Sequence, residues 1–354
     1  MAHGGRPHSR FTAGAFAAAA GALVIGATIT AAGCLTTQAL TGSLAFVGNV
    51  WPSGITDDEH FLRYWNQVTV ENAGKWGNVE AVRDQMQWRD LDSAYRFARE
   101  HHIPFRLHTL VWGQAQPPWL GPLSPEELRQ EVTEWFTLLG ERYPDVDMID
   151  VVNEPLHAQP PYMAALGGVG ETRWDWVIAA FELARRHFPR AMLGINEYGT
   201  LEHADATAGY LRLIGVLKQR GLIDSIGVQG HGLEDVSDET IAANLDLLAK
   251  SGLPIYVTEL DVGIADDEAQ AKRMQELLTL FTRNRHVRGV TLWGYQEGRI
   301  YQRRAFLLGA DGRERPALVW LREFTAQLPF STGEADCEGL SGRSLGRQPS
   351  PGRS

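Results

Sequence analysis

Two glutamates in similar surroundings are the residues of this sequence best suited to chemistry. Glu154 ends the apolar run IDVVNEP, and Glu259 lies in the run VTELDV. A buried carboxylate is costly unless it is paired, so each glutamate either binds a loop arginine or has a chemical role. Two carboxylates are the minimum apparatus for hydrolysing a glycosidic bond, because one protonates the leaving oxygen while the other attacks the sugar or activates water. The sequence leaves retention and inversion open, since these differ in the distance between the two groups.

The elements that must position these glutamates alternate along the chain. From residue 44 to 330, short apolar runs alternate with longer amphipathic segments, which is typical of a parallel sheet with helices between its strands. The predicted strands span residues 44–50, 66–72, 104–112, 146–154, 191–199, 225–232, 254–262 and 287–294. Eight such units predict a single α/β domain, a (β/α)8 TIM barrel. Helix start signals agree with this, with Ser124 and Ser237 as predicted N-caps.

Most of the polar candidates lie at the carboxyl ends of the predicted strands. In a (β/α)8 barrel these ends form the active-site face. The candidates are Glu71, Asn72, His108, Trp112, Asn153, Glu154, Asn196, Tyr198, Gln229, His231, Glu259, Asp261 and Trp293. We therefore expect one cleft at this end of the barrel.

The alternation of side chains along a strand gives expectations for the two strands that carry the glutamates. In the seventh strand, Glu259 points toward the barrel mouth and Thr258 faces the helices. In the fourth strand, Pro155 is expected to keep Glu154 extended. Asn153 and Glu154 can both reach the mouth only if the backbone is irregular there, for instance bulged.

Charge and the ends of the chain limit the partners and the location. The formal net charge is −10, from 33 basic and 43 acidic residues, which opposes binding to nucleic acid. Residues 11–35 contain no charged side chain and follow a basic start, so we expect a secreted, cell-surface or periplasmic protein, with a retained transmembrane anchor as the alternative. The segment that ends at Cys34 resembles a bacterial lipoprotein processing box, so residues 1–34 are predicted to be a signal peptide or a lipoprotein signal that attaches the protein to a membrane through lipidated Cys34. Residues 331–354 are predicted to be a disordered tail.

Six segments of the sequence resemble glycoside hydrolase family 10, whose members are mostly endo-1,4-β-xylanases. They are VTVENAGKW, LHTLVW, DVVNEP, GVQGH, VTELDV and GVTLWG, and the resemblance is collinear from about residue 46 to residue 324. It implies a retaining double displacement at internal β-1,4-xylosidic bonds of xylan, with Glu154 as the acid/base and Glu259 as the nucleophile. It also implies a polysaccharide or xylo-oligosaccharide substrate, no cofactor and no metal, and we expect a monomer.

The resemblance extends to the residues around the two glutamates. Asn153 would bind the sugar 2-hydroxyl. His231 and Gln229 would donate hydrogen bonds to Glu259, and Asp261 would orient His231. The substrate-binding set that the resemblance implies is Glu71, Asn72, Lys75, His108, Trp112, Asn153, Tyr198, Gln229, His231, Trp293 and Tyr301, with Tyr198 on the leaving-group side.

Three departures from the family's pattern affect the choice of substrate. Tyr301 stands where the family usually has tryptophan, and Glu197 stands where it commonly has aspartate. The segment Gly113-Gln114-Ala115 stands where many members have His-Ser-Gln. Two alternatives therefore stay open: a retaining β-glucanase or oligosaccharidase of the same fold, and a non-catalytic carbohydrate-binding lipoprotein.

Overall fold

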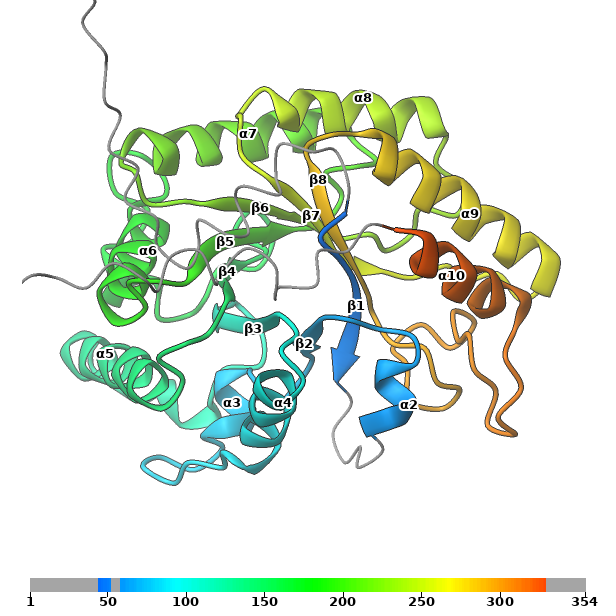
Figure 1. The fold of residues 1–354 in the computed structure, drawn as a ribbon. Coiled ribbons are helices and arrows are strands. Elements are labelled where there is room, and N and C mark those ends of the chain that lie inside the picture. Colours follow the sequence, from blue (N-terminus) through cyan, green and yellow to red (C-terminus); the bar gives the residue numbers. More distant parts are fainter. Residues whose placement is uncertain (1–43, 52–57, 329–354) are drawn as a thin grey trace, which may run out of the picture.

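The computed structural model describes residues 44–51 and 58–328, which form a closed barrel of eight parallel strands (Figure 1). The strands follow one another around the barrel in sequence order, and β8 closes it against β1. They are β1 (Phe46–Trp51), β2 (Val68–Val70), β3 (Phe105–Val111), β4 (Met148–Asn153), β5 (Met192–Glu197), β6 (Ser225–Val228), β7 (Ile255–Leu260) and β8 (Val287–Leu292). The predicted (β/α)8 barrel is confirmed, strand by strand. The predicted signal at residues 1–34 and the predicted tail at residues 331–354 lie outside the described residues.

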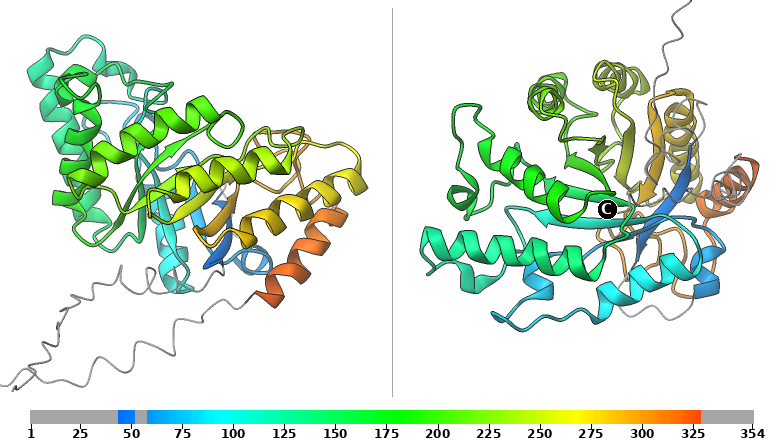
Figure 2. Two further views of the ribbon diagram at one scale, coloured as in Figure 1. Left: turned by 90° about the horizontal axis from the view of Figure 1, so that it is seen from above. Right: turned by 60° about the vertical axis from the view of Figure 1, so that its left-hand side comes forward.

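Helices surround the barrel, as Figures 1 and 2 show. They are α2 (Asp58–Leu62), α3 (Trp76–Val79), α4 (Arg89–Glu100), α5 (Pro125–Arg142), α6 (Asp175–His187), α7 (Ala204–Gln219), α8 (Asp238–Ala249), α9 (Asp267–Arg283) and α10 (Pro316–Gln327), with 3-10 turns at Pro118–Leu120 and Met163–Leu166. Both predicted N-caps are present: Ser124 forms a capping box with Glu127, and Ser237 accepts from the amide of Thr240. None of the described helices is long and apolar enough to cross a membrane.

The interior of the barrel combines aromatic packing with a buried ionic group. Phe46 and Tyr256 stack there with ring centroids 5.6 Å apart. Arg106 donates to Oδ1 of Asp150 at 2.8 Å, and Nδ1 of His108 lies 3.1 Å from Oδ2 of the same carboxylate. Burial would raise the pKa of Asp150, but Arg106 and His108 outweigh burial and hold this pKa below its usual range. Most other apolar side chains form a second cluster that the strands share with the helices.

Both strands that carry the two glutamates are irregular near their carboxyl ends. The register of β4 against β5 shifts between Asp150 and Val152. The register of β7 against β8 shifts between Val257 and Leu260. Such shifts re-aim side chains, so the irregularity expected for the fourth strand is confirmed, and the seventh strand has one that the sequence did not predict.

Glu154 is not extended, so the conformation expected from Pro155 is wrong. The φ angle of Glu154 is +54°. This left-handed conformation costs a glutamate about 1 kcal/mol or more. It is compensated locally, because the carbonyl oxygen of Glu154 accepts from the amides of His157 at 3.1 Å and Ala158 at 2.7 Å. The chain therefore turns directly after β4.

Two glycines should respond in opposite directions to the same substitution. A Cβ atom at Gly289, in β8, would lie 2.5 Å from the buried ring of Phe46. A Cβ atom at Gly215, in α7, would meet no described atom outside its own helix within 4 Å. We expect Gly289→Ala to destabilise the protein by about 1–3 kcal/mol and Gly215→Ala to stabilise it by about 0.5–1 kcal/mol. Equilibrium denaturation checks both values, and changes of the same sign would contradict the packing described here.

Candidate active site

Both glutamates are hydrogen-bonded to a single residue of β5, Asn196. The amide of Glu154 donates to the carbonyl oxygen of Asn196 at 2.8 Å. The side-chain amide of Asn196 donates to Oε1 of Glu259 at 2.6 Å. Glu259 is only 5% exposed, whereas Glu154 is half-buried. The backbone of Glu154 and the carboxylate of Glu259 are therefore both held by Asn196 at the carboxyl ends of the strands.

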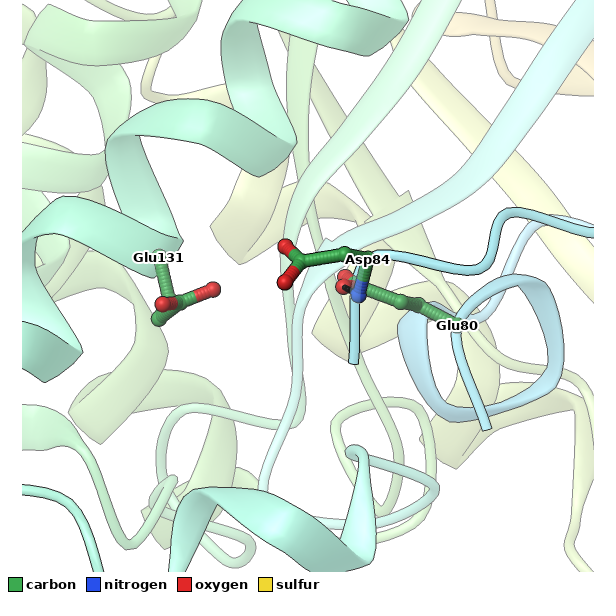
Figure 3. A group of neighbouring side chains, drawn as sticks. All are labelled: Glu80, Asp84 and Glu131. Atoms are coloured by element: carbon green, nitrogen blue, oxygen red, sulfur yellow. Dashed lines mark hydrogen bonds between the residues drawn. The ribbon is translucent and has the colours of Figure 1, made fainter. Parts of the chain in front are cut away.

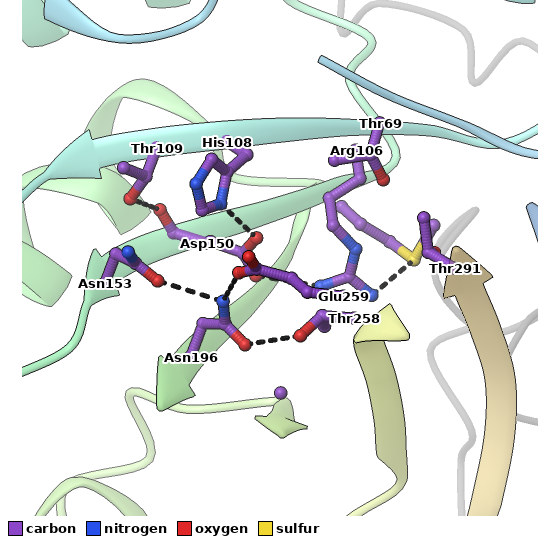
Figure 4. Close-up of polar contacts among 12 residues, drawn as sticks. Thr69, Arg106, His108, Thr109, Asp150, Asn153, Asn196, Thr258, Glu259 and Thr291 are labelled. Carbon is purple, nitrogen blue, oxygen red and sulfur yellow. Dashed lines mark hydrogen bonds and ion pairs between the residues drawn. The ribbon is translucent and has the colours of Figure 1, made fainter. Parts of the chain in front are cut away.

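A network of buried side chains fixes the amide of Asn196 (Figure 4). Its Nδ2 donates to Oδ1 of Asn153 at 2.9 Å in addition to Glu259, and its Oδ1 accepts from the hydroxyl of Thr258 at 2.6 Å. Thr258 therefore joins the network and does not face the helices, contrary to the sequence expectation. The register shift in β7 explains this result, because strict alternation does not hold across it.

The space for this network depends on a glycine in β6. A Cβ atom at Gly227 would lie 2.7 Å from Oδ1 of Asn196 and 2.9 Å from the carbonyl oxygen of Ile195. Gly227 pairs with Asn196 in the sheet, so any side chain there would press on the amide that holds Glu259.

The second oxygen of Glu259 faces a histidine. Nε2 of His231 lies 3.2 Å from Oε2 of Glu259, and Nδ1 of His231 lies 2.7 Å from Oδ2 of Asp261. Burial would lower the pKa of His231, but the hydrogen bonds and charges of Asp261 and Glu259 raise it to about 10. His231 is consequently a cation at neutral pH. The predicted contacts of His231 with Glu259 and Asp261 are present.

Glu154 has its own pair of donors. Nε2 of Gln229 donates to Oε1 at 3.0 Å, and Nε1 of Trp112 donates to Oε2 at 2.9 Å. Gln229 thus binds Glu154, so the bond to Glu259 predicted from the sequence is wrong. On Glu259, Asn196 donates to Oε1 and Nε2 of His231 faces Oε2.

Three of the predicted substrate-binding residues gather next to Trp112. Nζ of Lys75 donates to Oδ1 of Asn72 at 3.0 Å and lies 5.1 Å from the centroid of the Trp112 ring. Burial lowers the pKa of Lys75, although the charges of Glu71, Glu259 and Glu154 act in the opposite direction. Asn72 is exposed, and Glu71 and Lys75 are half-buried.

His108 and Trp293 line the floor of the same end of the barrel. The ring of Trp293 makes edge contacts with His108 at 5.3 Å and with His231 at 6.3 Å between centroids, and it is only 5% exposed. Tyr301 is 76% exposed, and its ring centroid lies 5.9 Å from that of His231. The peptide bond between His108 and Thr109 is cis.

Two residues for which the sequence predicted no role, His157 and Glu197, lie next to Tyr198. Its ring stacks on that of His157, with centroids 4.1 Å apart and planes inclined by 24°. Nδ1 of His157 lies 2.8 Å from Oε1 of Glu197, which is fully buried. Burial raises the pKa of Glu197, and the hydrogen bonds from His157, Leu156 and Tyr198 counteract this. The position of His157, three residues after Glu154, was the one available signal.

One group of carboxylates away from these contacts could hold a cation. Among the described residues, Glu80, Asp84 and Glu131 form the one cluster whose ligand atoms lie within 4.8 Å of one another (Figure 3). Glu80 already accepts from Nε1 of Trp76 and from the amide of Asp84, and Arg83 forms an ion pair with Glu131. These donors already bind the carboxylates of Glu80 and Glu131, so we assign the cluster no part in the chemistry.

The fold and the site together define a (β/α)8-barrel protein with a carboxylate pair at the ends of β4 and β7. The chain belongs to glycosyl hydrolase family 10, whose family model matches residues 32–326. It is 37% identical over 278 residues to endo-1,4-beta-xylanase B of Cellvibrio japonicus, a match that covers 78% of this chain and 45% of that protein. It is 28% identical over 291 residues to endo-1,4-beta-xylanase A of Thermotoga maritima, covering 71% of this chain and 26% of that protein. The chain thus spans less than half the length of these two relatives.

Solved structures agree on the fold. GH10 from Paenibacillus barcinonensis superposes with a TM-score of 0.70 at 23% identity, covering 83% of this chain and 97% of that one. Native xylanase 10B from Thermotoga maritima superposes with a TM-score of 0.69 at 23% identity, covering 82% and 97%. Each is a barrel of the same architecture as this chain.

The raised pKa of His231 predicts how stability depends on pH. The folded-state pKa is about 10, above the ordinary value near 6.5. The protonated histidine therefore stabilises the folded state fully below pH ~6.5, and this contribution is lost as pH rises toward 10. We expect the difference in unfolding free energy between wild type and His231→Gln to fall steadily over this range.

A second histidine provides the control. Burial lowers the pKa of His187, at the end of α6, so its contribution is present at high pH and is lost as pH falls below the ordinary value. The difference between wild type and His187→Gln should therefore be flat above pH ~6.5 and should fall as pH is lowered below that value. A flat profile for His231→Gln from chemical denaturation would show that the contacts with Asp261 and Glu259 do not hold the proton.

Proposed function

We propose that this protein is a retaining glycoside hydrolase that cleaves internal β-1,4-xylosidic bonds of xylan. The observation that carries the proposal is the attachment of Glu154 and Glu259 to the backbone and side chain of Asn196. Membership of family 10 and the names of the two relatives support the same activity.

In the first step, Glu154 acts as the acid and Glu259 as the nucleophile. An oxygen of Glu259 forms a bond with C1 of the sugar, while the bond between C1 and the leaving oxygen breaks. The electron pair of the broken bond stays on the leaving oxygen, which takes the proton of Glu154. Asn196 and protonated His231 orient the attacking carboxylate before the reaction, so little reorganisation is needed.

In the second step, water replaces the enzyme on C1. Glu154, now ionised, takes a proton from the water, whose oxygen bonds to C1 while the ester bond to Glu259 breaks. Two inversions at C1 give net retention. Asn153 would bind the sugar 2-hydroxyl. Asn196 donates to Oδ1 of Asn153, so the side-chain NH2 group of Asn153 is left to donate to the substrate.

The remaining predicted residues would bind the sugars on either side of the cleaved bond. Glu71, Asn72, Lys75 and His108 would contact the non-reducing side, and Tyr198 the leaving-group side. A β-glucan substrate is the second candidate, favoured by the exposed ring of Tyr301 where the family usually has the larger tryptophan. We also propose that the enzyme acts as a monomer without a metal or cofactor.

A substitution of the proposed nucleophile tests this function. We expect wild type to release reducing ends from xylan, and Glu259→Ala to lower the rate by at least about a thousandfold, because no covalent intermediate can form. Glu141→Ala, an exposed glutamate of α5, is the matched control and should retain activity. β-Glucan and mannan, assayed in parallel, decide the substrate.

The anomer of the first product decides the stereochemistry. Proton NMR should show the β-anomer forming before mutarotation. Equal rates for wild type and Glu259→Ala would refute the nucleophile, an α-anomer would refute retention, and xylan binding without any turnover would favour the carbohydrate-binding alternative.

We further propose that residues 1–34 direct export and that Cys34 carries a lipid. The uncharged segment at residues 11–35 supports export, and the sequence before Cys34 supports processing at that cysteine. In a bacterial host, wild type should fractionate with membranes and Cys34→Ala should become soluble outside the cytoplasm. Soluble wild-type protein in the medium would contradict the lipid, and an unprocessed cytoplasmic chain would contradict export.

A further inference from the structure

Glu197 binds three donors at the end of β5 and has no part in the mechanism above. Its Oε2 accepts from the amide of Leu156 at 2.8 Å. Its Oε1 accepts from the amide of Tyr198 at 3.0 Å and from Nδ1 of His157 at 2.8 Å. Two of these donors belong to the segment directly after Glu154. A fully buried carboxylate thus connects β5 to the chain that carries the acid/base residue.

That segment depends on outside support. Glu154 has a left-handed backbone, and such a conformation persists only where surrounding contacts hold it. Two residues later the amide of Leu156 is fixed by Glu197, and the ring of His157 is fixed between Glu197 and the ring of Tyr198. A change in this support therefore acts on the turn that carries Glu154.

The same segment passes close to Gly113. A Cβ atom at residue 113 would lie 2.2 Å from the carbonyl oxygen of Ala158 and 2.7 Å from that of Gln159. The chain after Glu154 therefore passes directly against the end of β3, where a larger residue would collide with it. The segment is thus bonded to Glu197 and lies close to Gly113.

We propose that Glu197 is the positioning residue for acid catalysis: it holds the segment after Glu154 and the His157–Tyr198 pair so that the carboxyl group of Glu154 stays at the leaving-group oxygen. The proposal rests on the function proposed above. Small displacements of a catalytic group have large effects, since a shift of about 1 Å can cost roughly a hundredfold in rate.

Glu197→Gln is the variant that tests this role. A glutamine offers one oxygen and one NH2 group, so at least one of the three donors that face Glu197 would meet another donor. We compare kcat/KM for xylotetraose, whose sugar leaving group needs a proton, with that for 2,4-dinitrophenyl β-xylobioside, whose phenolate leaves without one. We expect a loss of about 10- to 100-fold on xylotetraose and less than about threefold on the aryl glycoside, since general acid catalysis contributes about 10²–10⁴.

The aryl glycoside also shows whether the variant is folded and its nucleophile is active. His157→Phe is a second variant, which keeps a flat ring on Tyr198 but removes the bond to Glu197, and it should show a smaller loss of the same kind. Glu80→Gln, another buried glutamate, is the matched control and should not separate the two substrates. Equal losses on both substrates in the Glu197 and His157 variants would overturn the proposal. A wild type that cleaves neither substrate would instead refute the function itself.

Discussion

The site depends on the double use of Asn196. Its carbonyl oxygen holds the amide of Glu154, and its side chain holds the carboxylate of Glu259. The relative position of the two glutamates is therefore set largely by the geometry of one buried residue in a strand, and not by flexible loops. If the side-chain amide of Asn196 were reversed, its oxygen would face a carboxylate. In the observed orientation that oxygen instead accepts from the hydroxyl of Thr258.

The charges of the site are arranged so that one of them can disappear during the reaction. His231 carries a proton between Glu259 and Asp261, so one cation faces two carboxylates. When Glu259 forms an ester with the sugar in the proposed first step, its charge is lost and His231 remains paired with Asp261. The pair is then neutral overall, and no buried charge is left without a partner. Asp261 thus keeps a partner on His231 when the charge of Glu259 is lost.

The sequence was sufficient to predict the barrel and the positions of both glutamates, but it did not predict all the hydrogen-bond partners within the site. The alternation of apolar runs and amphipathic segments predicts the strands, because burial on both faces of a parallel sheet leaves a clear pattern. The predictions that Thr258 faces the helices and that Glu154 is extended were wrong for a common reason. Register shifts and a left-handed residue interrupt the regular strand geometry on which both predictions relied. The partner of Gln229 depends on which carboxylate the neighbouring strands bring within reach of its side chain. This is a tertiary property that no local sequence pattern contains. The only signal for His157 is its position three residues after Glu154, because it lies in a turn without a periodic pattern.

Two of the departures from the family's pattern, Gly113 and Glu197, contact the same segment of the chain. Gly113 leaves room for the backbone after Glu154, and Glu197 binds the amide of Leu156 in the same segment. A larger residue at 113 would press on the segment that Glu197 holds, so the two positions constrain each other. Both glutamates are bonded to Asn196 of β5, but the chain that follows Glu154 is a loop, and loops accommodate change more readily than strands. Variation among proteins of this fold should therefore concentrate on the side of the acid, where it can alter the leaving-group site while the attack on C1 is left unchanged.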